Sequence, residues 1–278
     1  MTEPDADDRA TGQDFYGPQY ARMDSELAAA IRLETFGEDI GQEGWRSAAE
    51  QAEIAAWLQL DAGQRVLDVA CGAGGPSLAL VRDFGCRLTG LDVAAEGIAH
   101  ASDLAHKRGL THLADFAVAD CGARLPFEDG GFDAILCIDA ISHLSDRQTV
   151  FAEWRRLLKA RGRLVFNDTF VVTGRLAKSE IDDRSAVTAN LDFVPPGFNE
   201  DAIRAAGLSL IAVHDRTDAV AGIASRWGAA RERHAEAIKR QEGADWSARR
   251  QRMLAAAAEL GRTRRLSRFL YLAQQPPS

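Results

Sequence analysis

The chain has 278 residues, 46% of them hydrophobic and 27% charged, which suffices for one large packed domain and is too apolar for a disordered chain. Its 33 Lys and Arg against 41 Asp and Glu give a net charge of -8, which argues against dedicated nucleic-acid binding because the chain repels phosphate backbones. The four cysteines form no Cys-x-x-Cys pair, and we find no signal peptide or long apolar run, so we expect reduced thiols, no metal site and a soluble cytoplasmic protein.

The N-terminal part is predicted to be helical after a short tail. Residues 1–12 are acidic and carry almost nothing to bury, so we expect a disordered tail there. From 13 to 60, aromatic and aliphatic residues recur at helical spacing, interrupted by Gly37, Gly41 and Gly44. This pattern indicates two or three helices, joined by a glycine-rich turn, that form an N-terminal cover.

Between residues 61 and 215, short apolar runs alternate with helical stretches. Parallel strands need long crossovers, so this alternation predicts a doubly wound sheet with helices on both faces and a ligand site at the carboxyl ends of the strands. The predicted strands cover 65–70, 86–92, 114–120, 132–138, 162–167 and 208–213, and the predicted helices include 76–84, 98–108 and 149–159.

A last strand is predicted at 268–273, within a closing segment 267–274. The preceding segment, 216–266, favours helix and carries apolar residues at three- and four-residue steps, which indicates a helical cap over the strand ends. The chain therefore predicts an α/β fold with a seven-stranded, mostly parallel, Rossmann-like sheet. We expect a single domain over 13–278, with its cofactor-binding core at 61–215.

The glycine-rich loop after the first predicted strand is the most specific motif. The strand ends at Asp68, glycines at 72, 74 and 75 allow a tight turn with close backbone approach, and Pro76 suits the first turn of the next helix. A dinucleotide fingerprint would place glycine where Ser77 stands, and a carboxylate at Asp68 favours a ligand with ammonium and sulfonium charges over a pyrophosphate. The alternative is a glycine turn that only connects strand to helix.

The second and third predicted strands also end in acids. Asp92 follows the glycines by about twenty residues, where a carboxylate can accept both hydroxyls of a ribose, and Asp120 with Cys121 could accept the exocyclic amine of adenine. Each acid alone is a common solvated residue at a strand end. Three acids at the ends of three successive strands are harder to explain in that way.

These motifs, together with 125–134 and 157–164, resemble the successive motifs of class I S-adenosylmethionine-dependent methyltransferases, most strongly over residues 45 to 170. The chain is most similar to small-molecule enzymes of bacterial specialised metabolism, such as sugar O-methyltransferases of indolocarbazole pathways, and more distantly to sarcosine and dimethylglycine N-methyltransferases. Ala70 stands where many relatives have glycine, and the absence of Asn-Pro-Pro-Tyr after the fourth strand argues against adenine- and glutamine-type N-methylation.

The resemblance implies S-adenosyl-L-methionine as the cofactor. Asp68, Gly72 and Gly74 would hold its methionine end, Asp92 its ribose, and Asp120 with Cys121 its adenine. Tyr16, Tyr20, Gln42, Trp45 and Arg46 lie in segments that fold over the cofactor in similar enzymes, although Trp45 is better explained as core. The expected cofactor-binding residues are thus Tyr20, Arg46, Asp68, Ala70, Gly72, Gly74, Asp92, Val93, Asp120, Cys121 and Ile138.

His143 and Asp168 are the candidates for the chemistry. Methyl transfer from a sulfonium is an in-line displacement, so positioning and exclusion of water do most of the work, and a base is needed only if the acceptor loses a proton. His143 follows the fourth strand and offers that base because imidazole titrates near neutrality, while Asp168, expected at the end of the fifth strand, could orient it. The alternative is a structural hydrogen bond of His143 within its turn, with Ser142 facing the acceptor.

The expected acceptor is a small molecule. Residues 226–268 carry twelve Lys or Arg and five Asp or Glu, so cap arginines such as Arg249 and Arg250 could attract an anionic acceptor, although a solvated face is the usual explanation. Oxygen is the expected methylated atom, on the strength of the His143 and Asp168 pair, and N-methylation of a small amine or amino acid is the alternative. Other classes left open are a nicotinamide oxidoreductase and a non-catalytic cofactor-binding protein, and the oligomeric state is open too, with a homodimer as one option.

Overall fold

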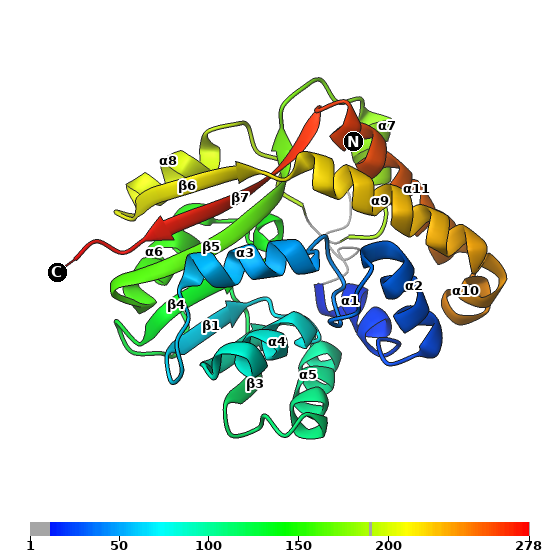
Figure 1. Ribbon diagram of the computed structural model, residues 1–278. Coiled ribbons are helices and arrows are strands. Elements are labelled where there is room, and N and C mark those ends of the chain that lie inside the picture. The colour runs from blue at the N-terminus through cyan, green and yellow to red at the C-terminus, as the bar shows by residue number, and fades with distance from the viewer. Residues whose placement is uncertain (1–11, 189–190, 278) are drawn as a thin grey trace, which may run out of the picture.

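The computed structural model describes residues 12–188 and 191–277, and within them seven strands form one sheet in the order β3-β2-β1-β4-β5-β7-β6 (Figure 1). Strands β1 to β5 pair in parallel, whereas β7 runs antiparallel between β5 and β6. The predicted seven-stranded, mostly parallel sheet is confirmed. The strands are β1 (Arg65–Val69), β2 (Arg87–Asp92), β3 (Ala114–Val118), β4 (Phe132–Cys137), β5 (Leu158–Val172), β6 (Ser209–Asp215) and β7 (Leu266–Gln274).

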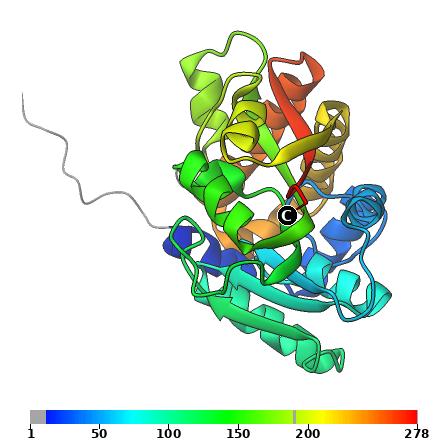
Figure 2. The ribbon, with the colours of Figure 1, turned by 90° about the vertical axis from the view of Figure 1, so that its left-hand side faces the viewer.

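Helices cover both faces of this sheet (Figure 2). Alternate residues of each strand point to opposite faces, so Val66 packs in one buried cluster with α3 (Ala48–Leu58), α4 (Gly75–Phe84) and α5 (Ala95–Lys107). Leu67 packs in the cluster on the other face, with α6 (Arg147–Leu157) and α8 (Phe198–Ala205). The buried apolar area of these two layers is the main driving force for the fold.

A third group of helices gathers at the end of the sheet to which the parallel strands point (Figure 1). Its buried cluster joins Ile31, Trp45, Val187, Trp227 and Leu254, so segments far apart in the chain share one small core. No helix in the described part of the chain is long and apolar enough to cross a membrane. The helices of this group are α1 (Gly12–Tyr20), α2 (Glu26–Phe36), α7 (Lys178–Arg184), α9 (Thr217–Arg233), α10 (Ala235–Glu242) and α11 (Ala244–Arg262).

The predicted tail and the predicted end of the fifth strand need separate comment. The predicted tail lies outside the described residues except for Gly12, which opens α1. The fifth strand was expected to end at 167 but continues to Val172, because β7 pairs with it as far as Leu266. Asp168 therefore lies inside β5 instead of at its end, which matters for its assigned role.

Candidate functional site

A cavity of about 480 Å³ lies at the carboxyl ends of β1, β2 and β4, below α1 and the segment 41–46. This is the position expected for a ligand site in a doubly wound sheet. His143 lines the cavity from the short 3-10 helix Ile141–His143, and Tyr16 and Gln42 line it from above. Every residue predicted to bind the cofactor also lines it: Tyr20, Arg46, Asp68, Ala70, Gly72, Gly74, Asp92, Val93, Asp120, Cys121 and Ile138.

The glycine loop brings backbone close to this cavity. Gly72 and Gly74 have φ of 56° and 73°, and a Cβ at Gly74 would stand 2.7 Å from the Cβ of Ala101, so only glycine fits that position without displacement. Ala70 also has a positive φ, 56°, which explains why glycine is common there in the resembled family. The strand-to-helix turn is therefore shaped for close approach by a ligand.

Gly75 of the loop packs tightly against the backbone of the cover segment at residues 40 and 41. A Cβ there would lie 2.5 Å from the Ile40 carbonyl oxygen and 2.7 Å from that of Gly41. We expect Gly75→Ala to push this segment away and to lower the free energy of unfolding by about 1–3 kcal/mol, as overpacking does. Urea denaturation measures this, with Gly222→Ala in α9 as the control, because a Cβ at Gly222 meets only the flexible end of Arg226. Equal free energies of unfolding for both variants would show that the cover segment can move away from Gly75 at no cost, which would contradict the prediction.

Two buried side chains of opposite charge, Asp68 and Arg46, line the cavity. Asp68 is 2% exposed and accepts a hydrogen bond from the Ser77 hydroxyl. Burial raises the pKa of Asp68 to about 6, against the opposing effects of Arg46 and Ser77. The Nη1 of Arg46 is buried and has no hydrogen-bond partner in the described part of the chain. A carboxylate and a guanidinium with spare hydrogen-bonding capacity suit a ligand that carries both an ammonium and a carboxylate.

Asp92 and Asp120 are held by backbone amides at the far end of the cavity. Gly72 N and Ala94 N each donate to Asp92 at 2.9 Å, one to each carboxylate oxygen, and Gly122 N donates to Asp120 at 2.9 Å. Burial raises the pKa of Asp92, opposed by these backbone hydrogen bonds. Each carboxylate is therefore fixed in orientation while its remaining lone pairs are open to ligand hydroxyl or amine groups.

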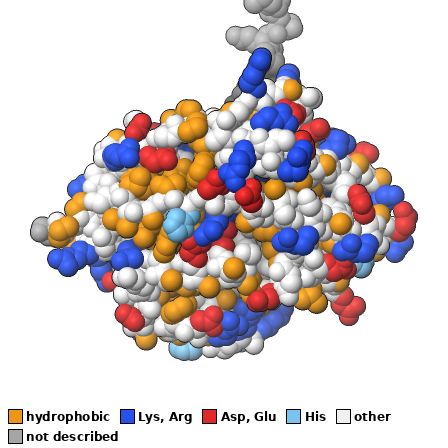
Figure 3. Space-filling view, turned by 45° about the horizontal axis from the view of Figure 1, so that its top comes forward, with side chains coloured by type: hydrophobic (Ala, Val, Ile, Leu, Met, Phe, Trp, Pro, Cys, Tyr) orange, Lys and Arg blue, Asp and Glu red, His pale blue; other side chains and the backbone are white. Residues whose placement is uncertain are grey.

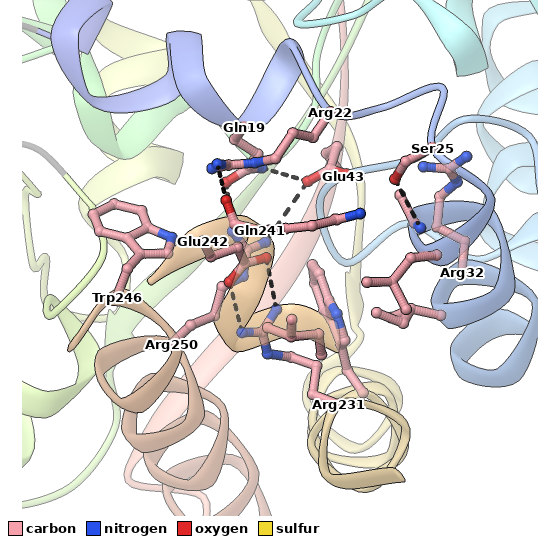
Figure 4. Close-up of a pocket in the computed structure, with 15 residues that line it drawn as sticks. Gln19, Arg22, Ser25, Arg32, Glu43, Arg231, Gln241, Glu242, Trp246 and Arg250 are labelled. Carbon is pink, nitrogen blue, oxygen red and sulfur yellow. Dashed lines mark hydrogen bonds and ion pairs between the residues drawn. The ribbon is translucent and has the colours of Figure 1, made fainter. Parts of the chain in front are cut away.

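Gln19 and Glu43, which the sequence analysis missed, fasten the cover of the cavity to the cap. Gln19 donates to Glu43 and accepts from Arg250 of α11, and the Arg250 guanidinium lies 3.6 Å from Glu43 (Figure 4). Arg22, just after α1, donates to the Gln241 carbonyl at 2.9 Å. These side chains surround a second, smaller cavity of about 60 Å³. The only sequence signal was the glycine-rich segment 37–44, which predicted a turn but not its contact with the cap.

The arginines of the cap are mostly engaged with acids of the same protein. Arg264 pairs with Asp215 at 2.6 Å and Asp218 at 2.7 Å, and Arg265 pairs with Glu180 at 2.6 Å. Blue and red side chains are accordingly interspersed over the face shown in Figure 3. The excess of basic residues in the cap thus forms no uniform basic surface on that face.

The expected pair of His143 and Asp168 is not formed, and this prediction was wrong. Asp168 is buried and its carboxylate accepts from Arg147 at 2.6 Å, from Asn199 at 2.9 Å and from the Phe170 amide at 2.9 Å. It lies inside β5 and faces α6 and α8, away from the cavity. His143 instead places Nε2 3.2 Å from the Tyr16 hydroxyl of α1.

Ser142 and Trp45 do not line the cavity. Ser142 is 4% exposed, and its carbonyl accepts from Asp192 at 2.9 Å. Trp45 packs edge-on against Trp227 in the third buried cluster, which favours its explanation as core. Its backbone amide donates to Asp139 at 2.7 Å, and Asp139, also missed from the sequence, lines the cavity with φ of 60°.

Part of the chain, including the glycine loop, matches a known domain family. Residues 67–166 match the family model described as a methyltransferase domain. This region of the chain is therefore similar to a methyltransferase domain. The matched residues of this methyltransferase domain run from the middle of β1 into β5 and include the loop at Gly72 and the acids at the ends of the first strands.

Individual relatives are similar to part of this chain. Methyltransferase GfsG of Streptomyces halstedii is 38% identical over 119 residues, 43% of this chain and 42% of the relative, and 27-O-demethylrifamycin SV methyltransferase of Amycolatopsis mediterranei is 31% identical over 119 residues, 43% of each. The chain therefore matches less than half the length of these relatives. A structure designated as a sarcosine dimethylglycine methyltransferase from Galdieria sulphuraria superposes with a TM-score of 0.72 at 23% identity, covering 81% of this chain and 83% of the other. This last likeness shows the shared fold of the methyltransferase domain.

Proposed function

We propose that this protein is a methyltransferase that uses S-adenosyl-L-methionine and methylates a small molecule of specialised metabolism. The observation that carries the proposal is the distribution of charge in the 480 Å³ cavity. Asp68 would hold the ammonium group, Arg46 the carboxylate, Asp92 the ribose hydroxyls and Asp120 the adenine amine. Each polar part of the cofactor thus meets a complementary side chain, and the orphaned Nη1 of Arg46 gains a partner.

In this proposal the protein contributes to catalysis by positioning the two substrates and by excluding water from them. Bound S-adenosylmethionine supplies an electrophilic methyl group, so the acceptor atom must be held in line with the bond to that methyl group, about 3 Å from it. Tyr16, Tyr20 and Gln19 cover the cavity from α1 and shield it from solvent. His143 lies among these residues and is proposed to take the proton of the acceptor.

We favour O-methylation because a hydroxyl acceptor must lose a proton, and an imidazole is in place to receive it. The rifamycin relative is named for a 27-O-demethyl substrate, which fits this choice. N-methylation of a small amine is the alternative, supported by the fold shared with a protein designated for sarcosine and dimethylglycine. An amine acts through its own lone pair, so the alternative predicts that His143 is dispensable.

The proposal is tested by two measurements on the full chain. Calorimetric titration with S-adenosylhomocysteine should show saturable binding, whereas NADH should show none; the reverse result would indicate a nicotinamide oxidoreductase. Incubation with methyl-labelled S-adenosylmethionine and metabolite extracts should then label a small molecule. Binding without any labelled product would overturn methyl transfer and favour a non-catalytic cofactor-binding protein.

We expect Asp68→Asn to weaken S-adenosylhomocysteine binding about 30-fold, because a hydrogen bond to a charged group contributes about 2 kcal/mol. The wild type should also bind more weakly as the pH falls below the Asp68 pKa of about 6, since the protonated carboxyl no longer attracts the ammonium group. Titrations between pH 5 and pH 7.5 check both effects. The variant should show a flatter pH dependence, and the exposed Asp115→Asn on β3 serves as the matched control. A variant with the pH profile of the wild type would exclude Asp68 as the ammonium contact.

A further inference from the structure

Arg184 is a buried arginine that the proposed function leaves unused. It ends α7 and is 2% exposed. Its guanidinium carbon lies 4.3 Å from the ring centroid of Phe170 and 5.3 Å from that of Trp45. Its Nη2 has no hydrogen-bond partner, and no carboxylate in the described part of the chain forms an ion pair with it. Arg184 therefore differs from Arg147 and Arg268, whose buried charges are paired with carboxylates.

The environment of Arg184 compensates its charge only in part. Removing a guanidinium from water costs several kcal/mol unless it is paired and hydrogen-bonded. Two aromatic rings offset some of this cost by cation-π attraction, but they supply no oxygen to the five N–H donors. Burial lowers the pKa of Arg184 to about 10, opposed by Asp139 and Tyr16, so the side chain stays charged at neutral pH. The guanidinium thus presents a charged set of donors that needs acceptors.

Arg184 lies behind the wall of the main cavity and does not itself line it: its guanidinium packs on Trp45, whose neighbours Gly44 and Arg46 line the cavity. Trp45, on which its guanidinium packs, donates its backbone amide to Asp139, and Asp139 lines the cavity close to His143. The electrostatic influence of Arg184 also reaches Tyr16, the residue that covers His143. Asp139 is ion-paired with Arg268 at 3.0 Å, so it attracts Arg184 through space without forming an ion pair with it. An anion that enters beside His143 would therefore meet Arg184 as a cation without a counter-ion.

A small void beside Arg184 has a second polar group without a partner. The void measures about 10 Å³ and is lined by Arg184, Thr169 and Arg268 among others. The hydroxyl oxygen of Thr169 is buried and unbonded in the described part of the chain. About 10 Å³ holds one oxygen atom the size of a water, and both groups can bond to it. The void is thus large enough for a single oxygen atom, and two of the residues that line it, Arg184 and Thr169, carry a buried polar atom without a partner in the described part of the chain.

We propose that Arg184, with the Thr169 hydroxyl, binds an oxyanion of the methyl acceptor, a carboxylate or a phosphate group. The inference rests on the proposed function and names the substrate class for it. One anion oxygen occupies the void between Arg184 and Thr169, and a second accepts from the planar guanidinium fork, which matches carboxylate and phosphate geometry. Arg184 is then a specificity residue: it orients the acceptor through its anionic end while the reacting atom lies near His143.

The test uses the full chain loaded with S-adenosylhomocysteine and titrated calorimetrically with inorganic phosphate, acetate and, as a neutral probe, methanol. The wild type should bind phosphate or acetate but not methanol, and the anion that binds identifies the acceptor group. Arg184→Met should weaken that binding at least about tenfold, and Arg184→Lys about three- to tenfold, since lysine keeps the charge but loses the fork. Arg240→Met removes the same charge from an exposed site on α10 and should change nothing.

Stability separates this role from a purely structural one. Arg184→Met removes an uncompensated buried cation, so its melting temperature without anion should equal or exceed that of the wild type. The proposal would be overturned if the wild type bound neither anion, or if Arg184→Met bound the anion as tightly as the wild type. It would also be overturned if the melting temperature of Arg184→Met fell below that of the wild type by the same amount with and without anion. If Arg184→Met still binds S-adenosylhomocysteine as tightly as the wild type, any of these outcomes contradicts only the role of Arg184 and not the proposed function. If the wild type itself does not bind S-adenosylhomocysteine, the proposed function is overturned. Titrations of the protein with the anions in the absence of cofactor then still test the role of Arg184.

Discussion

Arg268→Met should lower the free energy of unfolding by about 3–5 kcal/mol, because it leaves two buried carboxylates without their counter-ion. Arg268 is 1% exposed on β7 and donates to both oxygens of Glu50 at 2.6 Å and to Asp139 at 3.0 Å. Glu50 lies in the first turn of α3 and Asp139 follows β4 and lines the cavity, so one guanidinium joins three segments. Urea denaturation measures the loss.

Two further variants show whether the unpaired carboxylates of Glu50 and Asp139 cause this loss of stability. Arg268→Met combined with Glu50→Gln removes one carboxylate and should recover part of the stability, since neighbouring substitutions in one network are not additive. Arg204→Met breaks only the exposed ion pair with Asp201 and should cost at most about 1 kcal/mol. A loss below about 1 kcal/mol for Arg268→Met as well would mean that water reaches the network and screens it.

The sheet and the cofactor loop could be predicted because their signals are local. Alternation of apolar runs with helical stretches identifies each strand of a parallel sheet. The residues at 68, 72 and 74 all belong to one short strand-to-helix connection, so they are recognised together. The acids at 92 and 120 follow from the same rule, since parallel strands bring their carboxyl ends to one edge. These features need no knowledge of contacts between distant segments.

The parts that sequence reasoning missed depend on distant segments. Asp168 was expected at a strand end, but pairing with β7, almost a hundred residues later, extends β5 beyond it. Gln19 of α1, Glu43 and Arg250 of the cap helix α11 contact one another although they are far apart in the chain. Arg184 follows a stretch without clear periodicity, and its lack of a counter-ion is visible only when its neighbours in space are known.

His143→Ala should lower kcat for the labelled acceptor about 10²- to 10⁴-fold, the usual contribution of general-base catalysis, while S-adenosylhomocysteine affinity stays unchanged. The prediction rests on two observations: His143 lines the cavity, and its Nε2 lies 3.2 Å from the Tyr16 hydroxyl. Steady-state kinetics and calorimetry on the same preparations separate the two effects.

The two explanations of His143 differ in what restores activity. If the imidazole takes the acceptor proton, added imidazole should rescue His143→Ala in part, and Tyr16→Phe should reduce kcat less, since it removes only the group that orients the ring. If His143 only stabilises its turn, cofactor affinity and stability should fall together and imidazole should not rescue activity. The exposed His112→Ala is the matched control. Full activity of His143→Ala would instead favour an amine acceptor, because such an acceptor attacks through its own lone pair and needs no base.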